Sequence, residues 1–503
     1  IEQMEARLLV WGLVDGRIGR EELGDLIDPL LHQAFEQGIE DFYDANDVIE
    51  AMKTRGLLFE TDDYPYPGYR SRMAETVRLA FRLRQLFPQH SGVDGWQRAR
   101  TLVADFRFTR RRRRYPRRDL DPATVIEGIN RRLGDPTIGA VLQALLAGRG
   151  EECLLAEFQS RATHRILEGL AARRSNGTLV SAGTGSGKTL AFYLPAMARV
   201  GALRMRQGHG KCWVKLLAIY PRTELLRDQF AEVYAEARRL DGLLQRRGAG
   251  KIRIGTLFGE TPEKAAWLKQ YGHKGWRETS DRQGHVCSYM ACPQPRCDGE
   301  LLWRNVDLNQ GKEQLTCARC SHVVPADELV LTRDRLRADP PDILFTTTEM
   351  LNQRLSDTAS RHLFGLRPGA TRPPEMVLLD EVHTYSGNHG SQVGYLLRRW
   401  RHLVRAPITF VGLSATLRDG VRFFARLTGL EEHQVEEVTP RPGDMIAEGA
   451  EYLLALRGDP VSRASLLSTT IQSAMLMMRV MDRSQVNPVS YTHLRAHETV
   501  LDL

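Results

Sequence analysis

Six mostly apolar runs recur along the middle of this 503-residue chain, and each is followed by small or polar residues. Runs of four to six such residues are typical of strands buried on both faces in a parallel sheet. Segments with helical spacing of apolar residues separate them. The alternation predicts an α/β fold in which helices cover a parallel sheet. The runs are residues 179–182, 215–220, 252–257, 342–345, 376–379 and 408–413.

The same patterning divides the chain into regions. The first region is rich in helical patterns and predicts a mainly helical domain with a possible role in nucleic-acid binding. The second holds the six apolar runs and predicts the sheet domain. A strand and a helix follow as a linker, and the last region is a tail outside the fold. In order, the four regions are residues 1–150, 151–440, 441–487 and 488–503.

A glycine-rich loop follows the first apolar run and leads into a helix that begins near Lys188. The backbone N–H groups of such a loop, with the positive end of the helix, form a cradle for phosphate oxygens. The Lys188 ammonium suits the β- and γ-phosphates of ATP, and the Thr189 hydroxyl suits Mg²⁺. A glycine turn without a ligand is the alternative, which the strand–loop–helix context disfavours. The other expected loop contacts are Gly183, Thr184, Gly185, Ser186 and Gly187.

Two carboxylates, Asp380 and Glu381, follow the fifth run. The carboxyl ends of parallel strands are where doubly wound sheets place ligand chemistry. We expect Asp380 to hold Mg²⁺ through water and Glu381 to orient or deprotonate the attacking water. His383 is expected to couple this site to the next segment, where the hydroxyls of Ser414 and Thr416 bond back to the acidic residues.

Three other strand ends carry residues suited to a nucleic-acid backbone. A strand that passes into a helix N-terminus offers free N–H groups and nearby hydroxyls to a phosphate. The predicted nucleic-acid contacts are Pro221, Arg222, Thr223, Gly259, Thr346, Thr347 and Thr348.

Four of the seven cysteines form two close pairs between the third and fourth runs. Thiolates at that spacing can surround Zn²⁺ tetrahedrally and fix a module with few apolar residues. Disulfides are the alternative, which fits poorly with an odd number of cysteines and no secretion signal. Residues 283–325 are therefore expected to form a zinc-ribbon-like insertion, in which Cys287 or His285 could replace one ligand. The pairs are Cys292 with Cys297 and Cys317 with Cys320.

The net charge of +8 favours a polyanionic partner. The run Arg107–Arg118 places arginines beside aromatic residues, which is typical of phosphate neutralisation with base stacking. A solvated or disordered charge run explains it equally well. No long uncharged apolar run predicts a membrane span, and no signal-peptide pattern is present, so we expect a cytoplasmic location.

Together these motifs resemble the first RecA-like domain of a superfamily 2 helicase over residues 155–430, and the tetrapeptide Asp380–His383 places it near the DEAH group. The resemblance implies ATP and Mg²⁺ as cofactors. Gln159 lies where such helicases hold a glutamine, and it would present its amide to the adenine edge. The segments that carry the resemblance are residues 182–189, 221–224, 346–350, 380–383 and 414–416.

Residues 384–400 and the cysteine insertion are similar to DNA-repair helicases with a four-cysteine zinc domain and to helicases of bacterial phage-defence and DNA-modification islands. This implies an ATP-driven translocase on DNA, with protein partners in defence or repair. Such helicases complete the ATP site with arginines from a second RecA-like domain. That domain does not fit before residue 488, where the chain resembles a translated transposase sequencing adapter. We therefore expect this chain to bind nucleotide, hydrolyse it slowly and not unwind.

Two other functions fit part of the pattern. An ATP-gated nucleic-acid clamp or sensor would bind nucleotide without translocating, but it needs no water-activating carboxylate such as Glu381. A metabolic P-loop kinase would use the glycine loop, but it leaves Thr346–Thr348 and Ser414 unexplained.

Overall fold

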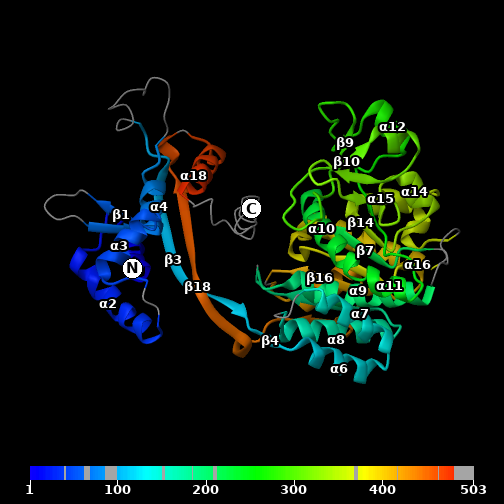
Figure 1. Ribbon diagram of the computed structural model, residues 1–503, viewed down its shortest axis with the longest axis horizontal. Coiled ribbons are helices and arrows are strands. Elements are labelled where there is room, and N and C mark those ends of the chain that lie inside the picture. The colour runs from blue at the N-terminus through cyan, green and yellow to red at the C-terminus, as the bar shows by residue number, and fades with distance from the viewer. Residues whose placement is uncertain are drawn as a thin grey trace. The chain divides into compact units, whose positions relative to one another are not determined.

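The computed structural model describes residues 1–38, 41–61, 68–84, 99–149, 153–183, 185–207, 212–367, 372–415, 417–462 and 464–480. The predicted tail, residues 488–503, lies outside them. The described residues form two compact units, one from residues 1–114 with 447–480 and one from residues 115–446 (Figure 1). None of the described helices is long and apolar enough to span a bilayer.

An eight-stranded parallel sheet forms the centre of the larger unit (Figure 1). All six predicted runs become strands of this sheet, so the expected α/β fold is confirmed. The sheet order is β13-β8-β14-β7-β15-β16-β6-β17. The predicted strands are β6 (Asn176–Ser181), β7 (Leu216–Tyr220), β8 (Ile254–Leu257), β14 (Ile343–Thr347), β15 (Met376–Leu379) and β16 (Thr409–Ser414). The two edge strands, β13 (Leu329–Val330) and β17 (Val435–Val438), are short and were not predicted.

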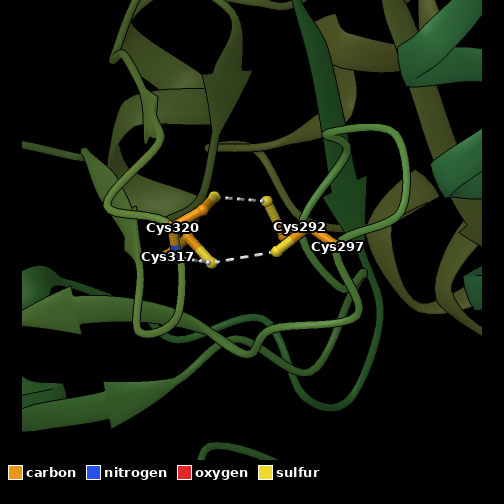
Figure 2. Close-up of side chains that lie close together, drawn as sticks. All are labelled: Cys292, Cys297, Cys317 and Cys320. Carbon is orange, nitrogen blue, oxygen red and sulfur yellow. Dashed lines mark hydrogen bonds between the residues drawn. The ribbon is translucent and has the colours of Figure 1, made fainter.

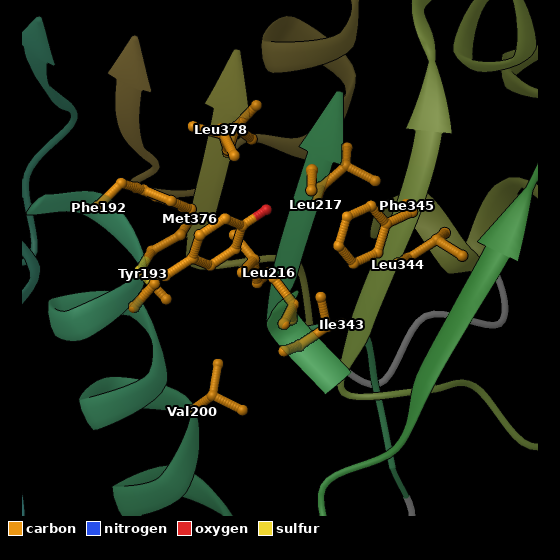
Figure 3. Packing of buried hydrophobic residues seen from close by; sticks show 14 of the residues in the cluster. Phe192, Tyr193, Val200, Leu216, Leu217, Ile343, Leu344, Phe345, Met376 and Leu378 are labelled. Carbon is orange, nitrogen blue, oxygen red and sulfur yellow. The ribbon is translucent and has the colours of Figure 1, made fainter. Parts of the chain in front are cut away.

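Helices cover the sheet and bury it. Every residue of β6, β7, β8, β15 and β16 is buried, as a parallel sheet with two covered faces requires. Helix α9 (Lys188–Gln207) points Phe192, Tyr193 and Val200 toward the strands (Figure 3). Each such side chain contributes about 1.5–3 kcal/mol to the hydrophobic free energy of folding. The Tyr193 hydroxyl lies 2.7 Å from that of Tyr220, so both buried oxygens are hydrogen-bonded.

Helices α6 (Pro122–Leu133) and α7 (Pro136–Ala147) belong to the larger unit, although the sequence grouped them with the N-terminal region. Each begins with an aspartate cap followed by proline. Their apolar residues, including Ile129 and Val141, join the core around α8 (Glu157–Ala171) and α9. The remaining long helices of this unit are α10 (Thr223–Arg239), α15 (Thr348–Leu355), α16 (Gly387–Val404) and α17 (Gly420–Thr428).

The cysteine insertion folds as a four-stranded antiparallel sheet in the order β12-β11-β10-β9. Its buried Trp303 contacts Trp276, with ring centroids 5.5 Å apart, and so joins the insertion to the main core. Its strands lie between residues 284 and 324, within the predicted range 283–325. The strands are β9 (Gly284–Val286), β10 (Leu301–Arg304), β11 (Leu315–Cys317) and β12 (Val323–Val324).

The smaller unit contains helices, a hairpin and a long ribbon. Strands β3 (Val103–Pro116) and β18 (Met445–Gly458) pair along the ribbon (Figure 1). The predicted linker strand and helix exist, but they pack with this unit, since α18 (Leu466–Val480) contacts α4 (Arg72–Phe81). The other elements are α1 (Glu2–Val10), α2 (Arg20–Glu36), α3 (Ala45–Thr54), β1 (Leu58–Thr61) and β2 (Gly68–Ser71).

Candidate functional site

The predicted site residues gather at one edge of the parallel sheet. Since β6, β16, β15, β7 and β14 are parallel neighbours, their carboxyl ends meet there. The glycine loop follows β6, and the acidic residues follow β15. The predicted nucleic-acid segments follow β7 and β14 at the same edge. The sequence order of the motifs gave no indication of which strands are neighbours.

The glycine loop has the conformation that a phosphate cradle requires. Gly185 and Gly187 have φ of +77° and +88°, which disfavours other residues at both positions. Ser186 is buried, and its Oγ has no hydrogen-bond partner in the described structure. A buried donor without a partner costs free energy, which a phosphate oxygen would recover. The loop therefore fits a triphosphate, with Lys188 at the first residue of α9; Thr184 lies outside the described residues.

Gln159 lies against this loop. Its Oε1 accepts from the Ala156 N–H at 2.9 Å, and its Nε2 donates to the Gly187 carbonyl at 3.0 Å. A Cβ on Gly187 would lie 2.5 Å from that Nε2, which gives the glycine a second reason to be there. Because both polar atoms of the amide are engaged within the protein, the predicted adenine contact would require the amide to turn. That contact stays a prediction.

Arg118 lies beside the same glycine, which the sequence did not predict. It belongs to β4 (Arg118–Leu120), where it pairs with Ala156 of β5 (Leu155–Ala156). Its Nη2 is 3.3 Å from the position of a Cβ on Gly187. The side chain is exposed, and within the described part of the chain no carboxylate pairs with it. The signal was hidden because Arg118 is the last residue of an arginine-rich run, and the run alone does not indicate which arginine lies beside the loop.

Asp380 lies at the tip of β15 with its charge opposed by its surroundings. Burial raises its pKa to about 7, and the negative charge of Glu381 acts in the same direction. The Glu381 N–H, which donates to Asp380 Oδ1 at 2.8 Å, and the Lys188 ammonium act the other way. The site therefore brings Lys188 within electrostatic range of Asp380. A carboxylate held in this way fits a divalent cation, whose charge would favour its ionised form.

Glu381 occupies a strained backbone position. Its φ of +46° and ψ of 50° are left-handed, which costs a non-glycine residue about 1–2 kcal/mol. The Thr384 hydroxyl donates to the Glu381 carbonyl at 2.7 Å and holds the turn. The Glu381 carboxylate lies 3.3 Å from His383 Nδ1. The same Nδ1 lies 3.3 Å from Ser414 Oγ. Ser414 therefore contacts the segment 380–383 through His383, and its coupling role stays a prediction; Thr416 lies outside the described residues.

The predicted nucleic-acid residues have different surroundings. Arg222 is exposed at the start of α10, where no side chain caps the helix, and Gly259 is exposed in open space. Thr347 caps α15 by accepting from the Met350 N–H at 3.3 Å.

Thr346 is fully buried, and its hydroxyl donates to the Leu257 carbonyl at 2.8 Å. Thr346 therefore joins two strands and does not face the surface. Pro221 and Thr223 are half-buried, and Thr348 is buried.

The four predicted zinc ligands converge in the insertion (Figure 2). Cys292 Sγ lies 3.6 Å from Cys320 Sγ, and Cys297 Sγ lies 3.8 Å from Cys317 Sγ. Four thiolates around Zn²⁺, each about 2.3 Å from the metal, would be separated by about 3.8 Å. These distances exclude disulfides and fit a structural zinc site. Backbone N–H groups of Arg319 and Cys320 point at Cys317 Sγ, which supports a thiolate there.

Cys287 and His285 are outside this cluster. The Cys287 thiol is buried in the main core, and burial raises its pKa to about 11. Among the described residues, the four cysteines form the only group of three or more potential metal ligands whose ligand atoms all lie within 4.8 Å of one another, and neither Cys287 nor His285 belongs to it. Neither Cys287 nor His285 therefore replaces one of the four cysteines as a ligand in this structure.

A phosphate loop facing an acidic pair at the edge of a RecA-like parallel sheet defines a P-loop nucleotide-binding domain. Residues 156–265 and 308–423 match the DEAD/DEAH box helicase family. This part of the chain is a DEAD/DEAH box helicase domain, and the unmatched residues 266–307 include β9 and β10 of the cysteine insertion.

Relatives have similar sequences over part of their length. The chain is 23% identical over 311 residues to the Druantia protein DruE of Escherichia coli (strain UMEA 4076-1), covering 53% of this chain and 16% of that protein. It is 26% identical over 264 residues to the Lhr helicase/uracil glycosylase of Escherichia coli (strain K12), covering 51% and 12%. The chain thus spans less than a fifth of these relatives. The solved DUF1998 helicase MrfA bound to DNA is 18% identical, with a TM-score of 0.39 over 70% of this chain and 34% of that one.

Proposed function

We propose that this chain is the nucleotide-binding motor domain of an ATP-driven helicase or translocase that acts on DNA. One observation carries the proposal: the glycine loop, Lys188 and the Asp380–Glu381 pair meet at one edge, where Lys188 acts on the charge of Asp380. The same edge carries the helix N-termini that suit a nucleic-acid backbone. A resemblance to zinc-domain repair helicases and to defence-island helicases favours DNA and a role in defence or repair.

Each residue at the edge has a proposed task in ATP hydrolysis. The loop N–H groups and Ser186 Oγ bind phosphate oxygens, and the Lys188 ammonium binds the β- and γ-phosphates. Thr189 and Asp380 would hold Mg²⁺, which supplies positive charge to the phosphates. Glu381, fixed by its strained turn, orients the attacking water and accepts its proton.

His383 is proposed to couple this chemistry to movement. Its Nδ1 lies 3.3 Å from the Glu381 carboxylate and 3.3 Å from the Ser414 hydroxyl. A movement of either group therefore alters the hydrogen bonding of His383. The start of α10 with Arg222 and the start of α15 are proposed to hold the polynucleotide backbone. The described residues contain one RecA-like sheet, and we propose that hydrolysis by this chain alone is slow for want of the arginines of a second domain.

The test compares wild type with Lys188→Ala and Glu381→Gln, using a fluorescent ATP analogue and an assay of phosphate release with and without single-stranded DNA. Lys188→Ala should lose nucleotide binding by at least about 100-fold, roughly 2.7 kcal/mol. Glu381→Gln should bind nucleotide normally and lose the hydrolysis that DNA stimulates. Equal nucleotide binding by wild type and Lys188→Ala would overturn the proposal.

The second candidate, an ATP-gated clamp, predicts that DNA affinity depends on nucleotide while hydrolysis is absent in wild type and Glu381→Gln alike. The presence of Glu381 favours the enzyme, since a clamp needs no carboxylate to activate water.

A further inference from the structure

The arginine run of β3 is ordered as one strand of a ribbon. Hydrogen bonds at its two ends, from the Arg117 N–H to the Asp444 carbonyl and from the Asp459 N–H to the Leu102 carbonyl, show that β3 and β18 run in opposite directions. The arginines therefore stand at fixed spacings beside the first half of β18. Of the alternative that the sequence left open, a solvated or disordered charge run, the pairing argues against the disordered form, while most of the arginines are solvent-exposed.

Positive charge is concentrated in this ribbon. Residues 103–114 and 447–458 contain seven arginines and three carboxylates, so half of the chain's net charge of +8 lies there. Like charges on neighbouring strand positions repel one another and oppose folding. A polyanion bound along the ribbon would remove that repulsion.

The ion pairs of the described residues leave several of these arginines without a carboxylate partner. Arg111 pairs with Glu451 at 2.6 Å. In the described residues, no carboxylate pairs with Arg107, Arg112 or Arg114, and all three side chains are exposed. Arg112 and Arg114 lie two positions apart on one face, about 6.7 Å along the strand.

The ribbon is anchored at one end and open along the arginines. Phe108 stacks on Tyr452, with ring centroids 6.1 Å apart, and joins the core that α1 and α4 form. The first half of β18, beside the arginines, carries three small residues, Ala447, Gly449 and Ala450, between Glu448 and Glu451. One of them, Gly449, has a φ of +71° and nothing within 4 Å of its Cβ position. A phosphate backbone can therefore approach closely.

We propose that the β3–β18 ribbon binds duplex DNA by entering the major groove, with Arg107, Arg112 and Arg114 on the phosphates. The major groove of B-form DNA, about 12 Å wide, admits a two-stranded ribbon, whereas the major groove of A-form RNA is too narrow. This site is additional to the strand-end edge of the proposed function, and it needs neither ATP nor Lys188.

The experiment measures binding of the full chain to a short fluorescent DNA duplex by anisotropy, between about 50 and 200 mM salt. The variant is Arg107→Gln with Arg112→Gln and Arg114→Gln. The matched control removes three other exposed arginines, by Arg131→Gln, Arg246→Gln and Arg277→Gln. Both variants are also tested for binding of the fluorescent ATP analogue, which reports the fold of the larger unit and the proposed function.

The ribbon variant should lose duplex affinity at least about tenfold and reduce the log–log salt slope by about 2 to 3, while the control changes little. Equal losses in both variants would show non-specific charge attraction and overturn the proposal. No loss in the ribbon variant, or an equal loss on an RNA duplex of the same sequence, would also overturn it. If the wild-type chain does not bind the ATP analogue, the proposed function is rejected. The duplex-binding result for the ribbon would still stand.

Discussion

The side-chain amide of Gln159 donates a hydrogen bond to the carbonyl oxygen of Gly187 at 3.0 Å, while its oxygen accepts from the Ala156 N–H. One side chain thus links the start of α8 to the last glycine of the phosphate loop. The bond holds the carbonyl of a glycine whose φ of +88° few other residues adopt.

Gln159→Glu should weaken ATP binding about tenfold, the effect of losing one hydrogen bond of about 1.4 kcal/mol. The glutamate can still accept from the Ala156 N–H, but it cannot donate to the Gly187 carbonyl. Titration with a fluorescent ATP analogue measures the affinity. A melting curve close to that of wild type is the control for the fold, and unchanged ATP affinity would contradict the role given to this bond.

Arg118→Ala should weaken nucleotide binding about threefold to tenfold, because it removes an exposed cation beside Gly187. Arg117→Ala is the matched control, since Arg117 is a neighbouring exposed arginine that pairs with Asp119 at 2.6 Å. Comparing ATP with inorganic tripolyphosphate locates the contact. A loss with both ligands indicates the phosphates, a loss with ATP alone indicates the base or sugar, and equal affinities of Arg118→Ala and Arg117→Ala contradict the prediction.

Asp380→Asn should change how stability depends on pH. The pKa of Asp380 is raised to about 7 in the fold, so the protonated form is favoured and the folded state binds the extra proton. Its contribution to stability is present below about pH 4 and is lost as pH rises through 7. With a chelator present, Asp380→Asn should therefore gain up to about 4 kcal/mol relative to wild type between pH 4 and 8. Denaturant unfolding at each pH measures this gain, and parallel pH profiles would reject the prediction.

Cys317→Ala should remove bound zinc and lower the melting temperature, because a structural metal contributes its binding free energy to folding. Cys287→Ala is the control, since that thiol is buried but lies outside the four-sulfur cluster. Metal analysis of the purified chain should find one zinc per molecule in wild type and Cys287→Ala. Full zinc content in Cys317→Ala would mean that the metal is held elsewhere.

The local sequence determined which segments are strands, where the phosphate loop begins and which cysteines cluster. These features depend on short-range chemistry: apolar runs must be buried, glycines allow positive φ, and paired thiolates at short spacing fit one metal ion. The six strands and the four-sulfur cluster therefore appear in the structure where the sequence predicted them.

The tertiary structure alone decided which of these segments are neighbours. It buried Thr346 where its hydroxyl bonds the Leu257 carbonyl, placed Arg118 beside Gly187, and paired β3 with β18 across more than 300 residues of chain. It also moved α6 and α7 into the larger unit, because their apolar faces join its core. The physical reason is that strand pairing and core packing depend on the total apolar surface that the whole chain buries. The pattern of a single segment carries no information about that total.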